Sequence, residues 1–163
     1  MNSSLREQLD YTESSVTLSA HQLVGRDWVF GGVYRASRVQ LDASYPDISE
    51  VAAAQNKFTA RTSDDGTLQT LNLQAIYQNP AGFFARLDGI WTRQENGGDM
   101  GALAGDNFWQ CNVLAGHRFF HRHAEISAGI LNLTAADYHL NPLNLYQETP
   151  RDRTFYTQFK FQF

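Results

Sequence analysis

The chain has 163 residues, of which 42% are hydrophobic, 13% aromatic and 18% charged. This length suits one domain, and no stretch approaches the roughly 20 apolar residues that a membrane-spanning helix needs. The single cysteine excludes an intramolecular disulfide framework and a cysteine-rich zinc module, and the formal net charge of -4 argues against a nucleic-acid-binding surface.

Residues 1–13 form a polar N-terminal segment without the apolar core of a secretory signal. From residue 14 onward, apolar and polar residues alternate with a period of two, which places successive side chains on opposite faces of a β-strand. The first such segment, near Val16–Val24, is followed by a less regular one over 28–45, in which Trp28 and Tyr34 lie on one parity and Val39 and Leu41 on the other. A β-bulge near Ala36 is predicted to reconcile them.

Five further segments alternate more cleanly, over 67–78, 83–92, 108–119, 124–130 and 155–163. A short helical turn is expected only at 48–56. The connections alternate between short turns, at 25–27, 79–82 and 120–123, and long ones, at 46–66, 93–107 and 132–153. This rhythm predicts an all-β fold, an antiparallel up-and-down meander of about seven or eight strands. Short turns at one end and long loops at the other are typical of outer-membrane barrels.

Alternation alone does not say whether the apolar faces meet lipid or a protein core. The polar face is rich in uncharged amides rather than Lys and Glu, and aromatic residues gather at both ends of the strands. These features favour a transmembrane β-barrel over residues 14–163. The residues expected to face lipid are Leu71, Leu73, Tyr77, Leu87, Trp91, Trp109, Val113, Ile126, Ile130, Phe155, Phe159 and Phe161. The residues expected to line the lumen are Asn72, Gln74, Arg86, Asp88, Gln110, Asn112, Arg118, Gln158 and Lys160, with Arg35 and Arg38 as further charged candidates.

The C-terminal Phe163 lies in phase with the apolar side of its strand. It resembles the signal by which the barrel-assembly machinery recognises bacterial outer-membrane barrels. That resemblance places Phe163 at the periplasmic end and the start of the first strand outside the cell. Because bacterial barrels have an even number of strands, we expect either an upstream part of a larger barrel or a poor eighth strand within residues 1–13.

The tail carries a family resemblance. Its residues are Asn132-Leu133-Thr134, Asp137-Tyr138 and Pro150-Arg151-Asp152-Arg153-Thr154-Phe155, ahead of a last strand that ends in Phe163. Over about the last thirty residues this resembles the closing stretch of TonB-dependent receptors, which implies a plugged barrel of about 22 strands that imports iron chelates, cobalamin or similar solutes. The insertion 141–146 departs from that pattern and points to a related family with a periplasmic domain and an export or porin-like barrel.

No catalytic, metal or cofactor site is predicted. His121 and His123 are spaced to approach one metal ion, but two ligands are insufficient, so a polar turn is the better interpretation. His21 and His117 have no triad partner at a recognisable spacing. The glycine-rich loop 97–106 lacks the residues of a phosphate loop or an EF-hand and is read as an extracellular loop.

The sequence therefore predicts a non-enzymatic segment of a TonB-dependent receptor-like transporter or porin in the bacterial outer membrane. Its expected partners are outer-membrane lipid, the assembly machinery, an upstream plug or periplasmic domain, and an unidentified solute. One alternative is a complete eight-stranded structural or adhesive barrel. The other is a soluble calycin-like barrel that binds a ligand in its interior.

Overall fold

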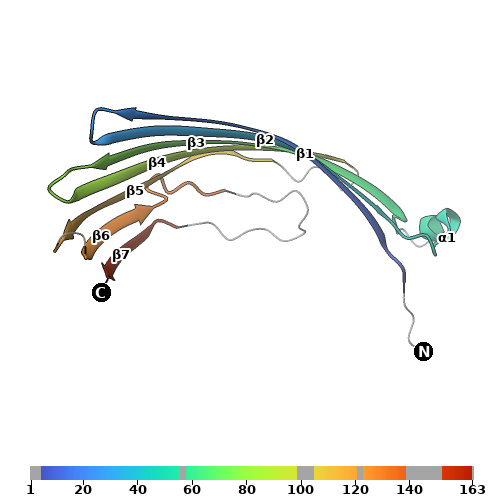
Figure 1. Ribbon diagram of the computed structural model, residues 1–163. Helices are drawn as coiled ribbons and strands as arrows, with labels where there is room; N and C mark the ends of the chain where they lie inside the picture. The colour runs from blue at the N-terminus through green and yellow to red at the C-terminus, as the bar shows by residue number, and fades with distance from the viewer. Residues whose placement is uncertain (1–4, 56–57, 99–104, 121–122, 139–151, 163) are drawn as a thin grey trace.

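The computed structural model is an all-β fold with a single sheet of seven antiparallel strands, which neighbour each other in sequence order (Figure 1). The structure describes residues 5–55, 58–98, 105–120, 123–138 and 152–162. The strands are β1 (Gln8–Val24), β2 (Trp28–Ser44), β3 (Arg61–Gln78), β4 (Phe83–Gly98), β5 (Asn107–Phe119), β6 (Ala124–Leu131) and β7 (Thr154–Phe161). The predicted meander is confirmed, and none of the helices among the described residues is long and apolar enough to cross a bilayer.

Three strands are longer at one end than the alternation indicated. β1 already begins at Gln8, so residues 8–13, predicted as a polar segment, continue this strand and do not form an eighth one. β3 begins at Arg61 and β4 continues to Gly98, within stretches predicted as long connections. These extensions were missed because the apolar side chains that mark one face of a strand are replaced there by polar ones.

The predicted bulge near Ala36 is wrong. β2 pairs one-to-one with β1 from Gln8↔Ser44 to Val24↔Trp28, and the pairing with β3 is equally continuous. The change of parity has another cause: the two faces of β2 exchange their chemical character near Ala36, while the backbone continues without interruption.

Tight turns join the strands at one end of the sheet. Gly25 and Gly82 have positive φ values of 63° and 101°, which L side chains adopt only with strain. A Cβ on Gly82 would also lie 2.2 Å from the carbonyl oxygen of Arg118. The opposite end carries the short helix α1 (Glu50–Gln55), which begins after Ser49 and confirms the helical turn expected at 48–56.

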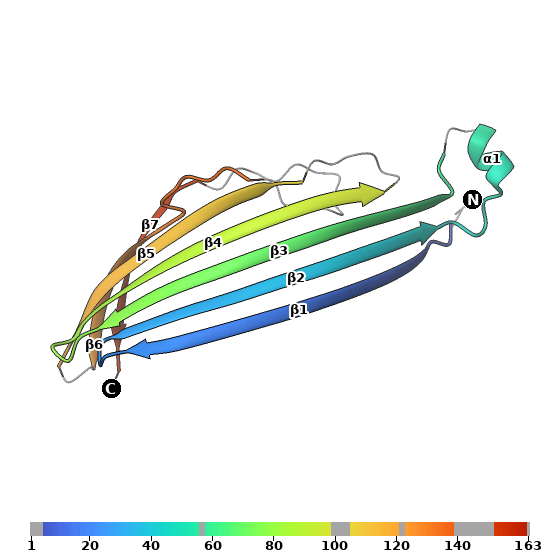
Figure 2. The same cartoon turned by 90° about the horizontal axis from the view of Figure 1, so that it is seen from above.

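The sheet is long, curved and open (Figure 2). Its edge strands, β1 and β7, do not pair with each other. The chain exposes 11871 Å² of surface, whereas a compact protein of 18.4 kDa exposes about 8,200 Å². The buried apolar residues among those described are scattered and do not form a core: Ala53, Ala60, Phe84, Ala124 and Tyr138. A single curved sheet of this kind leaves one whole apolar face without protein contacts.

Candidate functional site

The two faces of the sheet differ in crowding as well as in chemistry. Side chains converge on the concave side of a curved sheet and diverge on the convex side. Thr92, Gln94 and Ser127 share one face and are 4%, 4% and 3% exposed. Leu73 and Ile126 lie on the other face and are 45% and 54% exposed. The first face is therefore the concave face, and the second is the convex face.

The convex face carries a continuous apolar band that crosses all seven strands. It is interrupted by Gln22, His117 and Thr157. The remaining members are Val16, Leu18, Ala20, Val24, Trp28, Phe30, Gly32, Tyr34, Ala36, Leu71, Leu73, Ala75, Tyr77, Phe83, Ala85, Leu87, Gly89, Trp91, Trp109, Cys111, Val113, Ala115, Phe119, Ala124, Ile126, Ala128, Ile130, Phe155, Phe159 and Phe161. All twelve residues that the sequence predicted to face lipid belong to this apolar band.

The apolar band stops part of the way along β1 to β4. Val16 to Val24 spans nine residues of β1, close to the 9–11 residues with which a strand crosses a bilayer. Beyond this limit the convex face becomes polar, a region that we call the polar extension. It consists of Gln8, Asp10, Thr12, Ser14, Arg38, Gln40, Asp42, Ser44, Arg61, Ser63, Asp65, Thr67, Gln69, Arg93, Glu95 and Asn107.

The boundary of the apolar band is oblique to the strands. On β1 it lies at Val16, but on β7 it lies at Phe155, which shares a row of paired residues with Gln22, six residues further along β1. Six residues correspond to about 20 Å along a strand, and six strand spacings to about 29 Å. If the boundary lies in one plane, the strands are tilted by about 35° from the perpendicular to that plane. This tilt is within the range of transmembrane barrels.

Aromatic side chains border the apolar band on both sides. At the end with the short turns, Trp28 packs against Tyr77 with ring centroids 4.9 Å apart, and Phe83 packs against His117 at 4.5 Å. At the other border, Trp91 and Trp109 face each other across β4 and β5. Tyrosine and tryptophan place an apolar ring and a polar atom side by side, so they favour the boundary between an apolar and a polar medium.

The concave face collects all nine residues that the sequence predicted to line a lumen. Its polar side chains are joined in pairs. Arg86 is bonded to Asp88 at 2.9 Å along β4, and Gln110 Nε2 donates to Asn112 at 3.1 Å along β5. Arg35 also lies on this face, whereas Arg38 lies on the convex face, in the polar extension. The prediction that Arg38 joins the other charged residues is therefore wrong.

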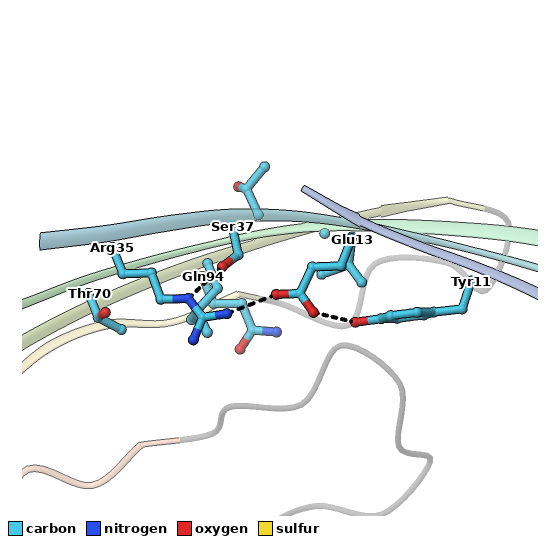
Figure 3. Close-up of a pocket in the computed structure, with 10 residues that line it drawn as sticks. Tyr11, Glu13, Arg35, Ser37, Thr70 and Gln94 are labelled. Carbon is cyan, nitrogen blue, oxygen red and sulfur yellow. Dashed lines mark hydrogen bonds and ion pairs between the residues drawn. The ribbon is translucent and has the colours of Figure 1, made fainter. Parts of the chain in front are cut away.

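A cluster that the sequence reasoning missed lies on the concave face, on the opposite side of the sheet from the polar extension. Figure 3 shows its side chains. Arg35 Nη2 is 3.0 Å from Glu13 Oε1, and its Nε donates to Ser37 at 3.2 Å. Tyr11 donates its hydroxyl to Glu13 Oε2 at 3.0 Å. This hydrogen bond, desolvation and the negative charge of Glu13 together raise the pKa of Tyr11. The positive charge of Arg35 lowers the same pKa and so offsets part of the increase. The predicted segment boundaries excluded Tyr11 and Glu13, because the alternation of β1 changes its parity between Tyr11 and Val16.

The described part of the tail motif forms a compact turn. Asn132 has a positive φ of 51° and is 2% exposed. Its Oδ1 accepts from the Ala136 amide at 2.9 Å, and its Nδ2 donates to the Ala136 carbonyl at 2.9 Å. Tyr138 stacks on Phe108 with centroids 4.3 Å apart. These residues thus shape the chain after β6, while residues 139–151 and Phe163 lie outside the described residues.

The described histidines, His21, His117 and His123, do not assemble into a site. His21 lies on the concave face of β1 and His117 on the convex face of β5. His121 and positions 99–104 of the glycine-rich loop are outside the described residues. Within the described ranges, no group of three or more His, Cys, Asp or Glu side chains is placed to hold a metal ion.

Comparison with protein-family models, curated proteins and solved structures finds no match to this chain. The chemistry of the two faces is therefore the basis for the functional argument.

Proposed function

We propose that this sheet is part of the wall of a β-barrel in the bacterial outer membrane, through which solutes pass. The convex face meets lipid, and the concave face meets water in the interior of the barrel. The observation that carries the proposal is the apolar band: it is confined to one face, ends on every long strand and is bordered by aromatic residues.

The limited height of the apolar band distinguishes lipid from other covers. A bilayer supplies an apolar layer of fixed thickness with water on both sides, so a wall that projects beyond it turns polar on the same face. The polar extension has that character. A calycin-like soluble barrel needs the reverse arrangement, because its apolar side chains must fill the concave side.

The paired polar side chains of the concave face support a water-filled interior. Paired charges such as Arg86 with Asp88 remain favourable in contact with water, whereas burial in a dry interior carries a large desolvation cost. The open strand order supports membership of a larger wall, since β1 and β7 each leave an edge free to pair with further strands. The more specific proposal, that this barrel belongs to a TonB-dependent receptor-like transporter, rests on the sequence resemblance of the tail.

Fractionation and conductance test this proposal. The full-length protein is expected in the outer-membrane fraction, to need detergent for extraction, and to migrate differently on a gel before and after heating. Added to a planar bilayer, it is expected to produce discrete conductance steps. A protein that stays soluble and monodisperse without detergent contradicts the membrane assignment. Membrane insertion without conductance or solute flux contradicts passage and favours a structural or adhesive barrel.

A further inference from the structure

The cluster around Arg35 lines a cavity of about 330 Å³ on the concave face, a volume that suits a small solute. Strands β1 to β4 all contribute side chains to it. Gly66 lies between Val39 on β2 and Asn96 on β4 in one row of paired residues. Because glycine has no side chain, this row leaves the space that the cavity occupies.

One polar group at this cavity lacks a partner. Gln94 is 4% exposed, and its Nε2 donates to Asn96 Oδ1 at 2.9 Å. The other polar atom of this amide, Gln94 Oε1, is buried and has no hydrogen-bond partner among the described residues. A buried acceptor left without a donor costs about 1–3 kcal/mol, so a bound group that donates a hydrogen bond relieves this cost.

The charges at the cavity are already balanced. Arg35 is paired with Glu13, and both carboxylate oxygens of Glu13 accept hydrogen bonds, from Arg35 and Tyr11. An ionic ligand has to displace one of these partners. Much of the remaining lining is apolar, from the ring of Tyr11 and the aliphatic side chains of Val39 and Leu68. Ser37 and Thr70 also line the cavity and contribute hydroxyl groups (Figure 3).

We infer that this cavity binds a neutral polyhydroxylated solute of the sugar class. The inference rests on the proposed function, because the concave face has to meet water that carries solutes. Sugar hydroxyls both donate and accept, so one hydroxyl donates to Gln94 Oε1 while others bond to Ser37 and Thr70. The C–H faces of a sugar ring contact Tyr11, Val39 and Leu68. A charged anion is disfavoured, because Glu13 already holds Arg35 and competes with the anion for it.

Isothermal titration of the full-length protein in detergent tests the inference, with glucose and maltotriose as neutral probes and inorganic phosphate as the charged one. Saturable binding of at least one sugar is expected, with no binding of phosphate. Gln94→Met keeps the length of the side chain but removes the acceptor, and is expected to weaken sugar binding about tenfold. Gly66→Val is expected to abolish binding by filling the cavity; Gly66 is not among the glycines with positive φ.

Gln40→Met is the matched control, since Gln40 is an exposed amide on the convex face of β2, and it is expected to leave binding unchanged. Circular dichroism checks that each variant folds. If Gln94→Met does not fold, Gly66→Val tests the inference on its own. Failure of both sugars to bind, or equal affinity in wild type, Gln94→Met and Gly66→Val, overturns the inference. Phosphate that binds and displaces the sugar also overturns it. Outer-membrane location and conductance remain separate readouts, so sugar binding can fail while the proposed function holds.

Discussion

Trp91 on β4 and Asn107 on β5 are joined across the border of the apolar band, where the indole Nε1–H donates to Asn107 Oδ1 at 2.8 Å. The ring of Trp91 lies in the last apolar row, beside Trp109, and Asn107 is one row further, in the polar extension. This arrangement keeps the apolar ring on one side of the border and its single polar atom directed to the other, as expected for a tryptophan at a lipid–water interface.

The three tryptophans are predicted to report two interfaces. Trp28 lies at one border of the apolar band, and Trp91 and Trp109 lie at the other. Variants that keep one tryptophan each, with phenylalanine at the other two positions, are expected to be quenched more by lipids brominated near the headgroup than by lipids brominated at the chain end. Strong quenching by aqueous iodide, without any quenching by lipid, contradicts this placement.

A charge in the middle of the apolar band is predicted to destabilise the protein far more than the same charge in the polar extension. Ala20 and Thr12 are both small, exposed residues on the convex face of β1. Ala20→Arg is expected to lower the free energy of unfolding in phospholipid vesicles by about 2–4 kcal/mol, and Thr12→Arg by about 0–1 kcal/mol. Urea titration in vesicles measures both values. Equal costs at the two positions argue against lipid contact.

The pair formed by Arg118 and Glu125 is predicted to be weak and sensitive to salt. The two residues lie opposite each other on β5 and β6, 2.8 Å apart, and Arg118 also covers the ring of Phe84 at 4.3 Å. In a water-filled interior, their coupling is expected to be about 0.5–1 kcal/mol and to fall as ionic strength rises. A double-mutant cycle with Arg118→Met and Glu125→Gln measures it. A coupling of several kcal/mol that salt does not change indicates a dry concave side.

The hydrogen bond from Tyr11 to Glu13 is predicted to give the protein an alkaline pH dependence. The pKa of Tyr11 is raised from the ordinary value of 10.0, so the folded state favours the protonated phenol. This contribution to stability is complete below pH 10 and is lost as the pH rises through the higher folded-state value. Ultraviolet titration of tyrosinate, compared between wild type and Tyr11→Phe, isolates this group. Glu13→Gln is expected to bring the Tyr11 transition back toward the ordinary value, and an unchanged transition contradicts the assignment.

The amino-acid sequence by itself determined the seven strands, their antiparallel order and the separation of apolar from polar side chains. The reason is that a period of two is a local property: Phe159 and Lys160 must point to opposite faces wherever the strand lies. Local pattern also identified the tight turns at Gly25 and Gly82, since few residues other than glycine accept their backbone angles.

Only the tertiary structure decided which face is concave, where the strands end and which distant residues meet. Curvature arises from all the strands together, so the alternation in a single strand does not report it. The parity change in β2 suggested a bulge because the sequence of one strand does not show where the neighbouring strands become polar on the same face. The cluster of Glu13, Arg35 and Gln94 depends on register across β1 to β4, which brings together residues far apart in the chain.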